Sequence, residues 1–509
     1  MLSKIKSYAL DGLSGYAVDV EVDINNGLPA YEMVGLASTA TKESKERVRA
    51  AIKNSGYKYP AQRIIINLAP ADTKKEGPTF DLAVAVGILA ASGLLENKDY
   101  KKYVIIGELS LDGKLRHVNG IMPLLISALQ EGYRKFIIPK SNAREASFIV
   151  DGAQVYALES LRETVDLLSG VEFAPVEASK YENARAKNSY GVDFADVKGQ
   201  SVAKRALEIA VAGGHNVIMI GPPGAGKTML AKCVPTIMPD MTFEEAIEVT
   251  KVHSVAGTLD SEIGIVTTRP FRTPHHTTTV PALIGGGTKA KPGEVSLANN
   301  GVLFLDEMPE YSRRALETLR QPLEDRKICV SRVQQTVEYP ANFMLVASMN
   351  PCPCGNYGSK TQICRCTPQQ IHNYVSKLSG PLMDRIDLQI EVDNITYDEL
   401  RGKGASTETS ADIRERVNRV RQIQRVRFKD DGILTNAEMG SREMNKYCAI
   451  DTNCERLLQK AFDKLNLSAR GTTRILKVAR TIADIEGCEN ILPAHIGEAI
   501  QYRGLDREF

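Results

Sequence analysis

The chain has 509 residues, of which 43% are hydrophobic and 25% are charged, and its net charge is +2. At roughly 150 residues per domain this length predicts about three domains, and the composition is ordinary for a soluble globular protein. No apolar run reaches the ~18 residues of a membrane span, and the first residues lack the apolar run of a secretion signal. We therefore expect a cytoplasmic chain without a membrane partner. The balanced charge does not indicate a nucleic-acid partner, although a local basic patch is compatible with it.

The hydrophobic pattern divides the chain into an α/β protein of three domains and a linker. Residues 1–168 alternate apolar runs with helix-like segments and predict a mixed α/β domain, and the polar residues 169–190 predict a linker. Residues 191–394 contain near-continuous apolar runs of the kind found in buried parallel strands, and residues 395–509 have helical spacing throughout. The supporting segments are Val18–Val22, Arg63–Leu68, Leu82–Ala91, Val104–Ile106 and Ile121–Glu131 in the first block, and Asn216–Ile220, Gly301–Leu305 and Phe343–Ser348 in the second.

A glycine-rich phosphate-binding loop follows the first predicted strand of the second block. It consists of Gly221, Pro222, Pro223, Gly224, Ala225, Gly226, Lys227 and Thr228. Glycines allow backbone N–H groups to converge on phosphate oxygens at the start of the next helix. We expect Lys227 to reach the β and γ phosphates of ATP, and the Thr228 hydroxyl to bind Mg²⁺.

Polar residues end the next two predicted strands. Asp306 and Glu307 follow Gly301–Leu305, and Asn350 follows Phe343–Ser348. After a phosphate-binding loop, Asp306 is predicted to fix Mg²⁺ and Glu307 to activate the attacking water. Asn350 is predicted to face the γ-phosphate and that water.

Together these motifs resemble the AAA+ ATPases, and the resemblance implies two further arginines. Arg385, in the segment Pro381–Asp387, matches the arginine finger that reaches a neighbouring subunit's γ-phosphate. Arg474, with Arg470 as the alternative, matches the region called sensor 2. Arginine suits both roles because its charge is permanent and its planar fork fits phosphate oxygens. The resemblance implies an oligomer, in this branch usually a hexameric ring.

The segment between the phosphate loop and Asp306 resembles the magnesium-chelatase branch of the AAA+ ATPases. Its residues are Arg269-Pro-Phe-Arg-Thr-Pro-His-His-Thr-Thr278, Gly285–Gly287 and Pro292–Gly301. This branch carries a hairpin before the second polar strand end, here Lys327–Arg332 with its return at Thr336–Tyr339. In ring helicases the hairpin points into the pore, so Arg332 and then Lys327 are candidate DNA contacts. A surface hairpin with solvated charges is the alternative.

Four of the nine cysteines are clustered as Cys352, Cys354, Cys364 and Cys366. Two close pairs of soft ligands suit a closed tetrahedral Zn²⁺ site, against the alternative of free thiols, and His372 is a possible fifth ligand. The adjacent His275 and His276 are expected to point to opposite faces of an extended chain and so not to share a metal.

Arginines recur between 414 and 427. Such a helix either tracks a phosphate backbone or presents a solvated surface, and we favour the surface.

The first block resembles the Lon-protease domain over most of residues 56–149. The matching motifs are Lys75–Asp81, Gly107–Gly113, Gly120–Met122 and Ile137–Lys140. In that family a serine nucleophile and a lysine base work together, but here Thr79 and Met122 stand at those positions. A thioether cannot accept a proton, so the resemblance implies a non-proteolytic relative, like the domain attached to the recombination protein RadA.

A Lon-like domain, a chelatase-type AAA+ module and a helical domain in this order resemble the ComM/YifB family. That family is described as hexameric DNA helicases for branch migration in natural transformation. The resemblance implies ATP-driven movement on branched or single-stranded DNA during homologous recombination. A chelatase-type ATPase that remodels a protein for metal insertion is the second hypothesis, and an ATP-dependent protease using Thr79 alone is the third.

Overall fold

The computed structural model describes residues 2–35, 43–71, 75, 77–95, 98–150, 152–185, 190–287, 290–332, 335–358, 362–394, 408–465 and 467–503. The described chain forms two compact units. The first contains Met1–Asn188 together with Phe243–Thr267, and the second contains Ser189–Thr242 and Thr268–Phe509. No helix among the described residues is long and apolar enough to cross a membrane.

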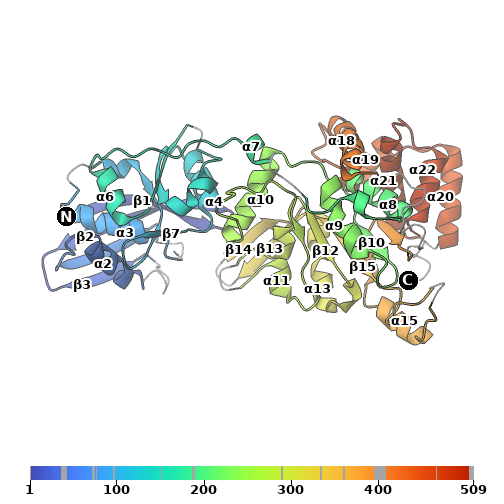
Figure 1. Ribbon diagram of the computed structural model, residues 1–509, viewed down its shortest axis with the longest axis horizontal. Helices are drawn as coiled ribbons and strands as arrows, with labels where there is room; N and C mark the ends of the chain where they lie inside the picture. The colour runs from blue at the N-terminus through green and yellow to red at the C-terminus, as the bar shows by residue number, and fades with distance from the viewer. Residues whose placement is uncertain are drawn as a thin grey trace. The chain divides into compact units, whose positions relative to one another are not determined.

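The first unit is built on a seven-stranded mixed sheet in the order β3-β4-β2-β1-β5-β8-β9 (Figure 1). Its strands are β1 (Leu2–Asp11), β2 (Ser14–Asn25), β3 (Ala30–Val34), β4 (Arg63–Ala69), β5 (Val104–Ile105), β8 (Lys135–Pro139) and β9 (Gln154–Leu158), and β6 (Glu108–Leu109) pairs with β7 (Leu115–Arg116). Its helices are α2 (Ser44–Asn54), α3 (Asp81–Ala91), α4 (Ile121–Gln130), α5 (Ala143–Ala146), α6 (Leu161–Leu168), α7 (Tyr181–Arg185) and α10 (Phe243–Ala256).

Alternation along the strands gives this sheet two apolar faces. In β8, Ile137 packs into the cluster with α2, α3 and α6, while Phe136 and Ile138 pack into the cluster with α4 and α5. Successive side chains of a strand point to opposite faces, so helices must cover both. Every residue of α3 is buried, as expected for a helix that is apolar on all sides.

Residues 243–267 belong to the first unit although they lie between segments of the second. Their helix, α10, supplies Ser254 to the amino terminus of α4. Gly120 donates its backbone N–H to Ser254 Oγ over 2.9 Å, and the Ser254 hydroxyl donates to Glu145. The Met122 N–H also donates to Glu145, over 2.9 Å. The first N–H groups of a helix have no partner within it, so α10 and Glu145 satisfy this terminus of α4.

The second unit is built on a parallel sheet in the order β11-β12-β15-β10-β16. Its strands are β10 (Val217–Ile220), β11 (Phe271–Arg272), β12 (Val302–Leu305), β15 (Met344–Met349) and β16 (Leu388–Glu391), with the hairpin β13 (Lys327–Arg332) and β14 (Gln335–Pro340). Its helices are α8 (Ser201–Gly213), α9 (Lys227–Ile237), α11 (Val280–Ile284), α12 (Glu294–Leu297), α13 (Arg313–Thr318), α14 (Arg320–Asp325), α15 (Pro368–Val375), α16 (Gly380–Met383), α18 (Ser410–Arg427), α19 (Ser441–Tyr447), α20 (Thr452–Leu465), α21 (Ala469–Ile485) and α22 (Pro493–Gln501).

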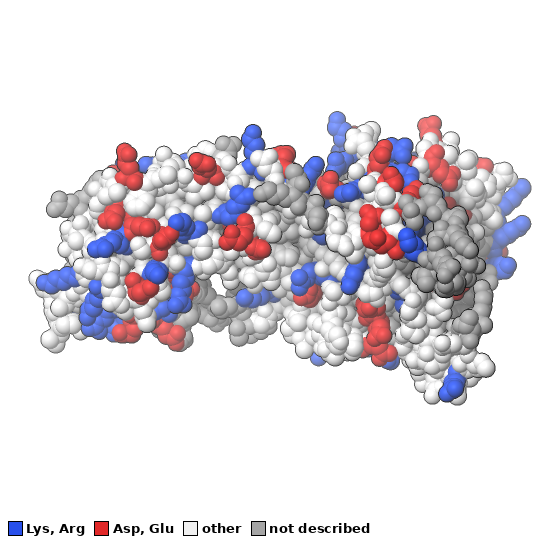
Figure 2. Space-filling view, in the orientation of Figure 1, with Lys and Arg blue, Asp and Glu red and all other residues white. Residues whose placement is uncertain are grey.

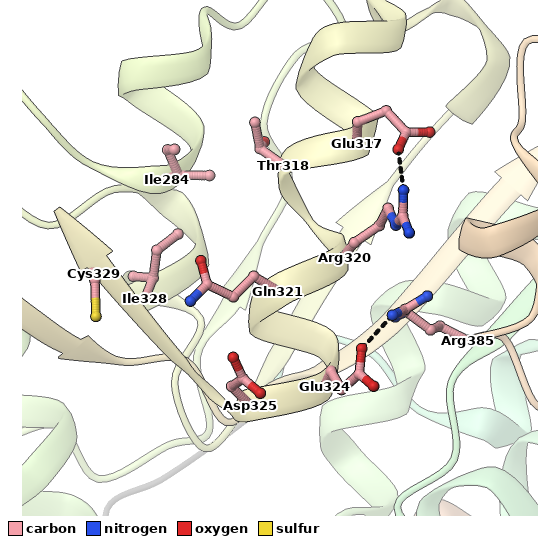
Figure 3. A pocket seen from close by; sticks show the side chains of 10 residues that line it. All are labelled: Ile284, Glu317, Thr318, Arg320, Gln321, Glu324, Asp325, Ile328, Cys329 and Arg385. Atoms are coloured by element: carbon pink, nitrogen blue, oxygen red, sulfur yellow. Dashed lines mark hydrogen bonds and ion pairs between the residues drawn. The ribbon is translucent and has the colours of Figure 1, made fainter. Parts of the chain in front are cut away.

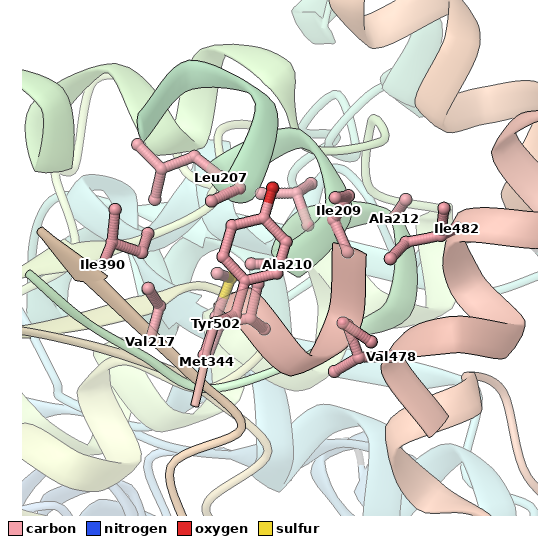
Figure 4. Packing of buried hydrophobic residues seen from close by; sticks show 14 of the residues in the cluster. Leu207, Ile209, Ala210, Ala212, Val217, Met344, Ile390, Val478, Ile482 and Tyr502 are labelled. Atoms are coloured by element: carbon pink, nitrogen blue, oxygen red, sulfur yellow. The ribbon is translucent and has the colours of Figure 1, made fainter. Parts of the chain in front are cut away.

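The carboxy-terminal helices share one hydrophobic core with the parallel sheet. Figure 4 shows Ala212 of α8 beside Ile482 of α21, and Tyr502 between Leu207 of α8 and Val478 of α21; all belong to one cluster. In the same cluster β10 contributes Val217 and Met219, while the opposite face of β10 packs Ile218 and Ile220 into a separate cluster. The helical region is therefore held to the sheet by apolar contact.

The predicted fold class is confirmed. The segments predicted as strands or helices lie within two residues of the observed elements, except that the strand predicted at Val18–Val22 extends over Ser14–Asn25. The predicted domain boundaries stay a prediction. The linker residues 186–189 and the start of the helical block, 395–407, lie outside the described residues.

We predict that Ser254→Ala loosens α10. The substitution leaves the buried N–H of Gly120 without its acceptor and removes a donor from Glu145, a loss of about 1–3 kcal/mol. Hydrogen exchange of the full chain, read by mass spectrometry, should show faster exchange in α10 and in the first turn of α4. The exposed Ser169→Ala is the control and should leave these peptides unchanged; unchanged exchange in Ser254→Ala as well would contradict the prediction.

Candidate functional site

The phosphate loop lies between β10 and α9, at the carboxyl end of β10. Gly224 and Gly226 have φ of 82° and 87°, in the left-handed region that glycine tolerates best. At Gly221 an added Cβ would lie 2.0 Å from the carbonyl oxygen of Val392, so a side chain cannot fit there. The backbone therefore adopts the cradle that the motif predicts.

Lys227 connects this loop to the end of β15. Its Nζ donates to the carbonyl oxygens of Gly221 and Pro222 over 2.6 and 2.9 Å, and to Asn350 Oδ1 over 3.2 Å. Burial lowers the pKa of Lys227, and the carboxylates of Asp306 and Glu307 act in the opposite direction. Lysine, asparagine and both acids therefore surround one position at this edge of the sheet.

Asp306 lies beside Thr228. The Thr228 hydroxyl donates to Asp306 Oδ2 over 3.0 Å, so the two predicted Mg²⁺ partners are adjacent. Oxygen ligands of this kind are the ones Mg²⁺ prefers. Glu307 has φ of 51°, an uncommon conformation for a residue other than glycine, directly after the strand.

Ser348 is a site residue that the sequence reasoning missed. Its hydroxyl donates to Asp306 Oδ1, and its Oγ accepts the N–H of Glu307 over 3.2 Å. From the neighbouring strand it thus fixes the Asp306 carboxylate and the backbone of Glu307. The signal was present in the sequence, because a buried serine two residues before Asn350 interrupts an apolar run.

Gln200 was also missed. It has φ of 57°, and its side-chain amide donates to the carbonyl oxygens of Ala225 and Asp393 over 3.2 and 2.6 Å. Gln200 therefore fastens the start of α8 to the phosphate loop.

Arg385 and Arg474 lie at the other end of β10. Asn216, just before this strand, donates its side-chain amide to the Arg385 carbonyl over 3.0 Å, and its carbonyl accepts the N–H of Asp387 over 2.9 Å. Arg474 donates to Asp387 Oδ1 over 2.7 Å. Four strand residues at ~3.3 Å each separate this group from the phosphate loop, so both arginines lie away from their own chain's phosphate site.

Asp387 is the fixed partner in this group. Burial opposes its charge, but Arg474 and His215 hold the pKa of the Asp387 carboxyl well below its usual range. His215 is fully buried, and burial lowers its pKa. The stable carboxylate therefore anchors Arg474 to the segment that carries Arg385.

The four clustered cysteines converge as predicted. The sulfur atoms of Cys352, Cys354 and Cys364 lie 3.4–3.7 Å apart, and all four fall within 4.8 Å of one another. Tetrahedral Zn²⁺ with Zn–S of about 2.3 Å requires sulfur atoms about 3.8 Å apart, so the donor set fits zinc. His372, the possible fifth ligand, is not part of this group.

Backbone N–H groups already favour thiolate in this cluster. The N–H groups of Arg365 and Asn356 lower the pKa of Cys354 to about 6, and Tyr357 donates to Cys352 Sγ over 3.3 Å. Burial and the neighbouring sulfur atoms raise the pKa of Cys366 to about 12, because adjacent thiolates repel one another without a cation. An added Cβ at Gly355 would lie 2.6 Å from the Pro223 ring, so this loop packs on the phosphate loop.

The expectation that His275 and His276 point to opposite faces is wrong. Their ring centroids lie 4.1 Å apart, because the chain turns there instead of continuing β11. No group of potential metal ligands among the described residues includes them.

Three arginines of α18 bind acceptor groups within the same chain. Arg416 pairs with Glu208, Arg427 pairs with Asp484, and Arg421 donates to the Val211 carbonyl over 2.8 Å. Figure 2 shows basic and acidic side chains interspersed over the face in view. The described part of α18 thus favours a structural role for these three cations.

The hairpin β13–β14 forms in the predicted place. Lys327 Nζ lies 3.0 Å from Glu338 Oε1 on the opposing strand, so its charge is compensated. Arg332 pairs with Gln335 in the strand register, and its side chain lies outside the described residues.

Three protein families match successive parts of the chain. The family described as subunit ChlI of Mg-chelatase matches residues 20–142, and the family described as magnesium chelatase, subunit ChlI, matches residues 193–400. The family described as magnesium chelatase, subunit ChlI C-terminal, matches residues 407–503. Competence protein ComM of Haemophilus influenzae is 45% identical over 99% of this chain and 98% of its own length. YifB of Escherichia coli is 42% identical over the same shares. The chain belongs to the ComM/YifB family.

Membership in this family implies an ATPase of the magnesium chelatase-like AAA+ type, with ATP and Mg²⁺ as its expected ligands. Lon protease 2 of Bacillus subtilis is 27% identical over 30% of this chain, and the DNA repair protein RadA of Aquifex aeolicus is 33% identical over 21%. The predicted Lon-like relationship is therefore confirmed at the level of fold. Met122, at the position of the family's lysine base, is fully buried and gives its N–H to Glu145.

We predict that the purified protein contains about one Zn²⁺ per chain, bound by four thiolates. Metal analysis by mass spectrometry should find that Cys364→Ser lowers the zinc content markedly, because a closed site loses one of its four ligands. The control Cys329→Ser, an exposed cysteine on β13, should retain the metal. A wild-type content well below one Zn²⁺ per chain would reject the site.

Proposed function

We propose that this protein is an ATP-dependent, ring-forming DNA motor, a helicase or branch-migration factor of homologous recombination of the natural transformation type. The main support for a ring-shaped oligomer is that Arg385 and Arg474 lie at the end of β10 opposite to the phosphate loop. Arginines so placed complete an ATP site only when a second subunit supplies the nucleotide. Closed cyclic symmetry satisfies every such interface at once, and we propose a hexamer.

In this proposal each half-site has its own role. The loop Gly221–Thr228 binds the ATP phosphates, and Thr228 and Asp306 hold Mg²⁺. Glu307 accepts a proton from the water that attacks the γ-phosphate, and Asn350 orients that water beside Lys227. From the neighbouring chain, Arg385 and Arg474 stabilise the charge that develops on the phosphate. Zinc at the four cysteines braces the loop that packs on Pro223 and takes no part in the reaction.

Support for DNA as the substrate comes from the hairpin and from the relatives. The hairpin β13–β14 projects two strands between α14 and β15, and we propose that Arg332 contacts the phosphate backbone there. Lys327 is the weaker candidate because Glu338 compensates its charge. The full-length relative is named a competence protein, and a partial relative is named a DNA repair protein.

The second candidate is a chelatase-type ATPase that remodels a protein partner for metal insertion. The family descriptions that match three segments of the chain favour it. The four-cysteine loop, for which the chelatase-type candidate has no use, and the partial similarity to the DNA repair protein RadA favour the DNA motor.

We predict that DNA stimulates the ATPase. Purified protein with Mg²⁺-ATP should hydrolyse ATP several-fold faster with single-stranded or branched DNA, and should displace a labelled strand from a three-strand junction. Glu307→Gln should retain ATP binding but lose about 10²-fold or more in turnover, because an amide cannot accept the proton of water. No DNA stimulation and no strand displacement by the active wild type would reject the motor and leave the chelatase-type candidate.

Mixing inactive variants tests the ring. Lys227→Ala damages the phosphate-binding side of an interface and Arg385→Ala damages the opposite side, so mixed rings contain some interfaces with both sides intact. We expect the mixture to hydrolyse ATP faster than the sum of the separate variants. The matched control combines Lys227→Ala with Glu307→Gln, which both damage the same side and should not restore activity. A Lys227→Ala and Arg385→Ala mixture as inactive as this control would contradict an arginine acting between subunits.

A further inference from the structure

Arg385 lies in a pocket of about 510 Å³ in the second unit. Figure 3 shows Glu317 and Arg320 paired on one wall, and Glu324 on α14 paired with Arg385 across the pocket. Ile328 and Cys329 of β13 complete a wall next to α14. The pocket therefore joins the predicted finger to the base of the hairpin.

Two of the three guanidinium nitrogens of Arg385 have partners within the chain. Its Nη1 donates to the Pro381 carbonyl over 2.6 Å, and its Nη2 pairs with Glu324. Its Nε is buried and has no hydrogen-bond partner among the described residues. The Arg385 side chain is 10% exposed and that of Glu324 is 58% exposed, so the carboxylate is the outward and exchangeable member of the pair.

Glu324 faces more than one cation. The hydrogen bond from Arg385 holds the pKa of the Glu324 carboxyl below its usual range, and the charges of Arg470 and Arg474 act in the same direction. A carboxylate among three arginines occupies the kind of position that a phosphate would also occupy. Carboxylate and phosphate are alternative partners for the same planar fork of arginine.

We propose that Glu324 is a positioning residue that binds Arg385 when no nucleotide faces it and gives Arg385 up to the γ-phosphate of ATP in the neighbouring subunit. The inference rests on the proposed function, because it needs Arg385 to act between subunits. By pairing with Arg385, Glu324 restricts the conformations that the Arg385 side chain can adopt in the pocket. It also competes with ATP, so the finger engages only when a triphosphate is present and returns to Glu324 after the phosphate leaves.

The Glu324–Arg385 pair lies close to the base of the hairpin. Glu324 lies in the last turn of α14, and β13 begins at Lys327 after Arg326, whose φ is 56°. Arg326 is itself tied to Asn342 and Glu438, which fixes the point at which the chain turns into β13. The Glu324–Arg385 pair therefore lies three residues before the first residue of the hairpin, with the anchored Arg326 between them.

Glu324→Gln tests the exchange, since it keeps the shape of the side chain and removes the competing charge. In the absence of DNA we expect the KM for ATP to fall about three- to tenfold, the change that corresponds to losing a partly exposed ion pair of about 1 kcal/mol. ATP-dependent assembly, followed by light scattering, should occur at a correspondingly lower protein concentration. Glu324→Asp keeps the charge and should have a KM between those of Glu324→Gln and the wild type.

Glu317→Gln is the matched control, because it makes the same change in the same pocket but frees Arg320 instead of Arg385. Its KM and assembly should stay near the wild type. An unchanged or higher KM in Glu324→Gln would overturn the proposal, as would an equal fall in Glu317→Gln. These assays contain no DNA. If DNA does not stimulate the wild-type ATPase, the DNA motor is rejected, but the comparison of the Glu324 and Glu317 variants still tests the exchange.

Discussion

Strand β10 determines the arrangement of both halves of the ATP site. At its carboxyl end the chain turns directly into the phosphate loop, and at its amino end Asn216 binds the backbone of Arg385 and Asp387. Hydrogen bonding between parallel strands prevents β10 from sliding, so the two ends keep a fixed separation. The phosphate loop and the two arginines therefore lie at opposite ends of one strand, and the proposed ring depends on this separation.

The carboxy-terminal helices depend on the same sheet. They pack on α8 and β10 through one apolar core, and Arg474 on α21 is tied to Asp387, two residues beyond Arg385 (Figure 4). The buried Asp387 carboxylate is stable only while its cationic partner Arg474 remains in place. The helical region is therefore linked by an ion pair to the segment that carries Arg385.

The first unit is Lon-like, and Met122 lies where the resemblance to that family places the lysine base. The Met122 N–H donates to Glu145, and the neighbouring Gly120 N–H donates to Ser254 of α10, whose hydroxyl also donates to Glu145. The segment 243–267 leaves the second unit's chain shortly after α9, the helix that begins at Lys227. A helix supplied from the nucleotide-binding part of the chain is thus a structural component of the Lon-like unit, and the chain passes between the two units three times.

The sequence by itself determined the local chemistry. A glycine-rich loop between a buried strand and a helix, acids at the end of the next strand and four closely spaced cysteines depend on short-range geometry, and their neighbours in the structure agree with that reading. The tertiary structure decided what depends on contacts distant in sequence. Glu324 beside Arg385 and Ser254 at the start of α4 have no signature in spacing, because each partner comes from another element. The pair of histidines was misjudged because a turn, in which the Thr278 N–H donates to the His275 carbonyl, replaced the extended chain that their adjacency suggested.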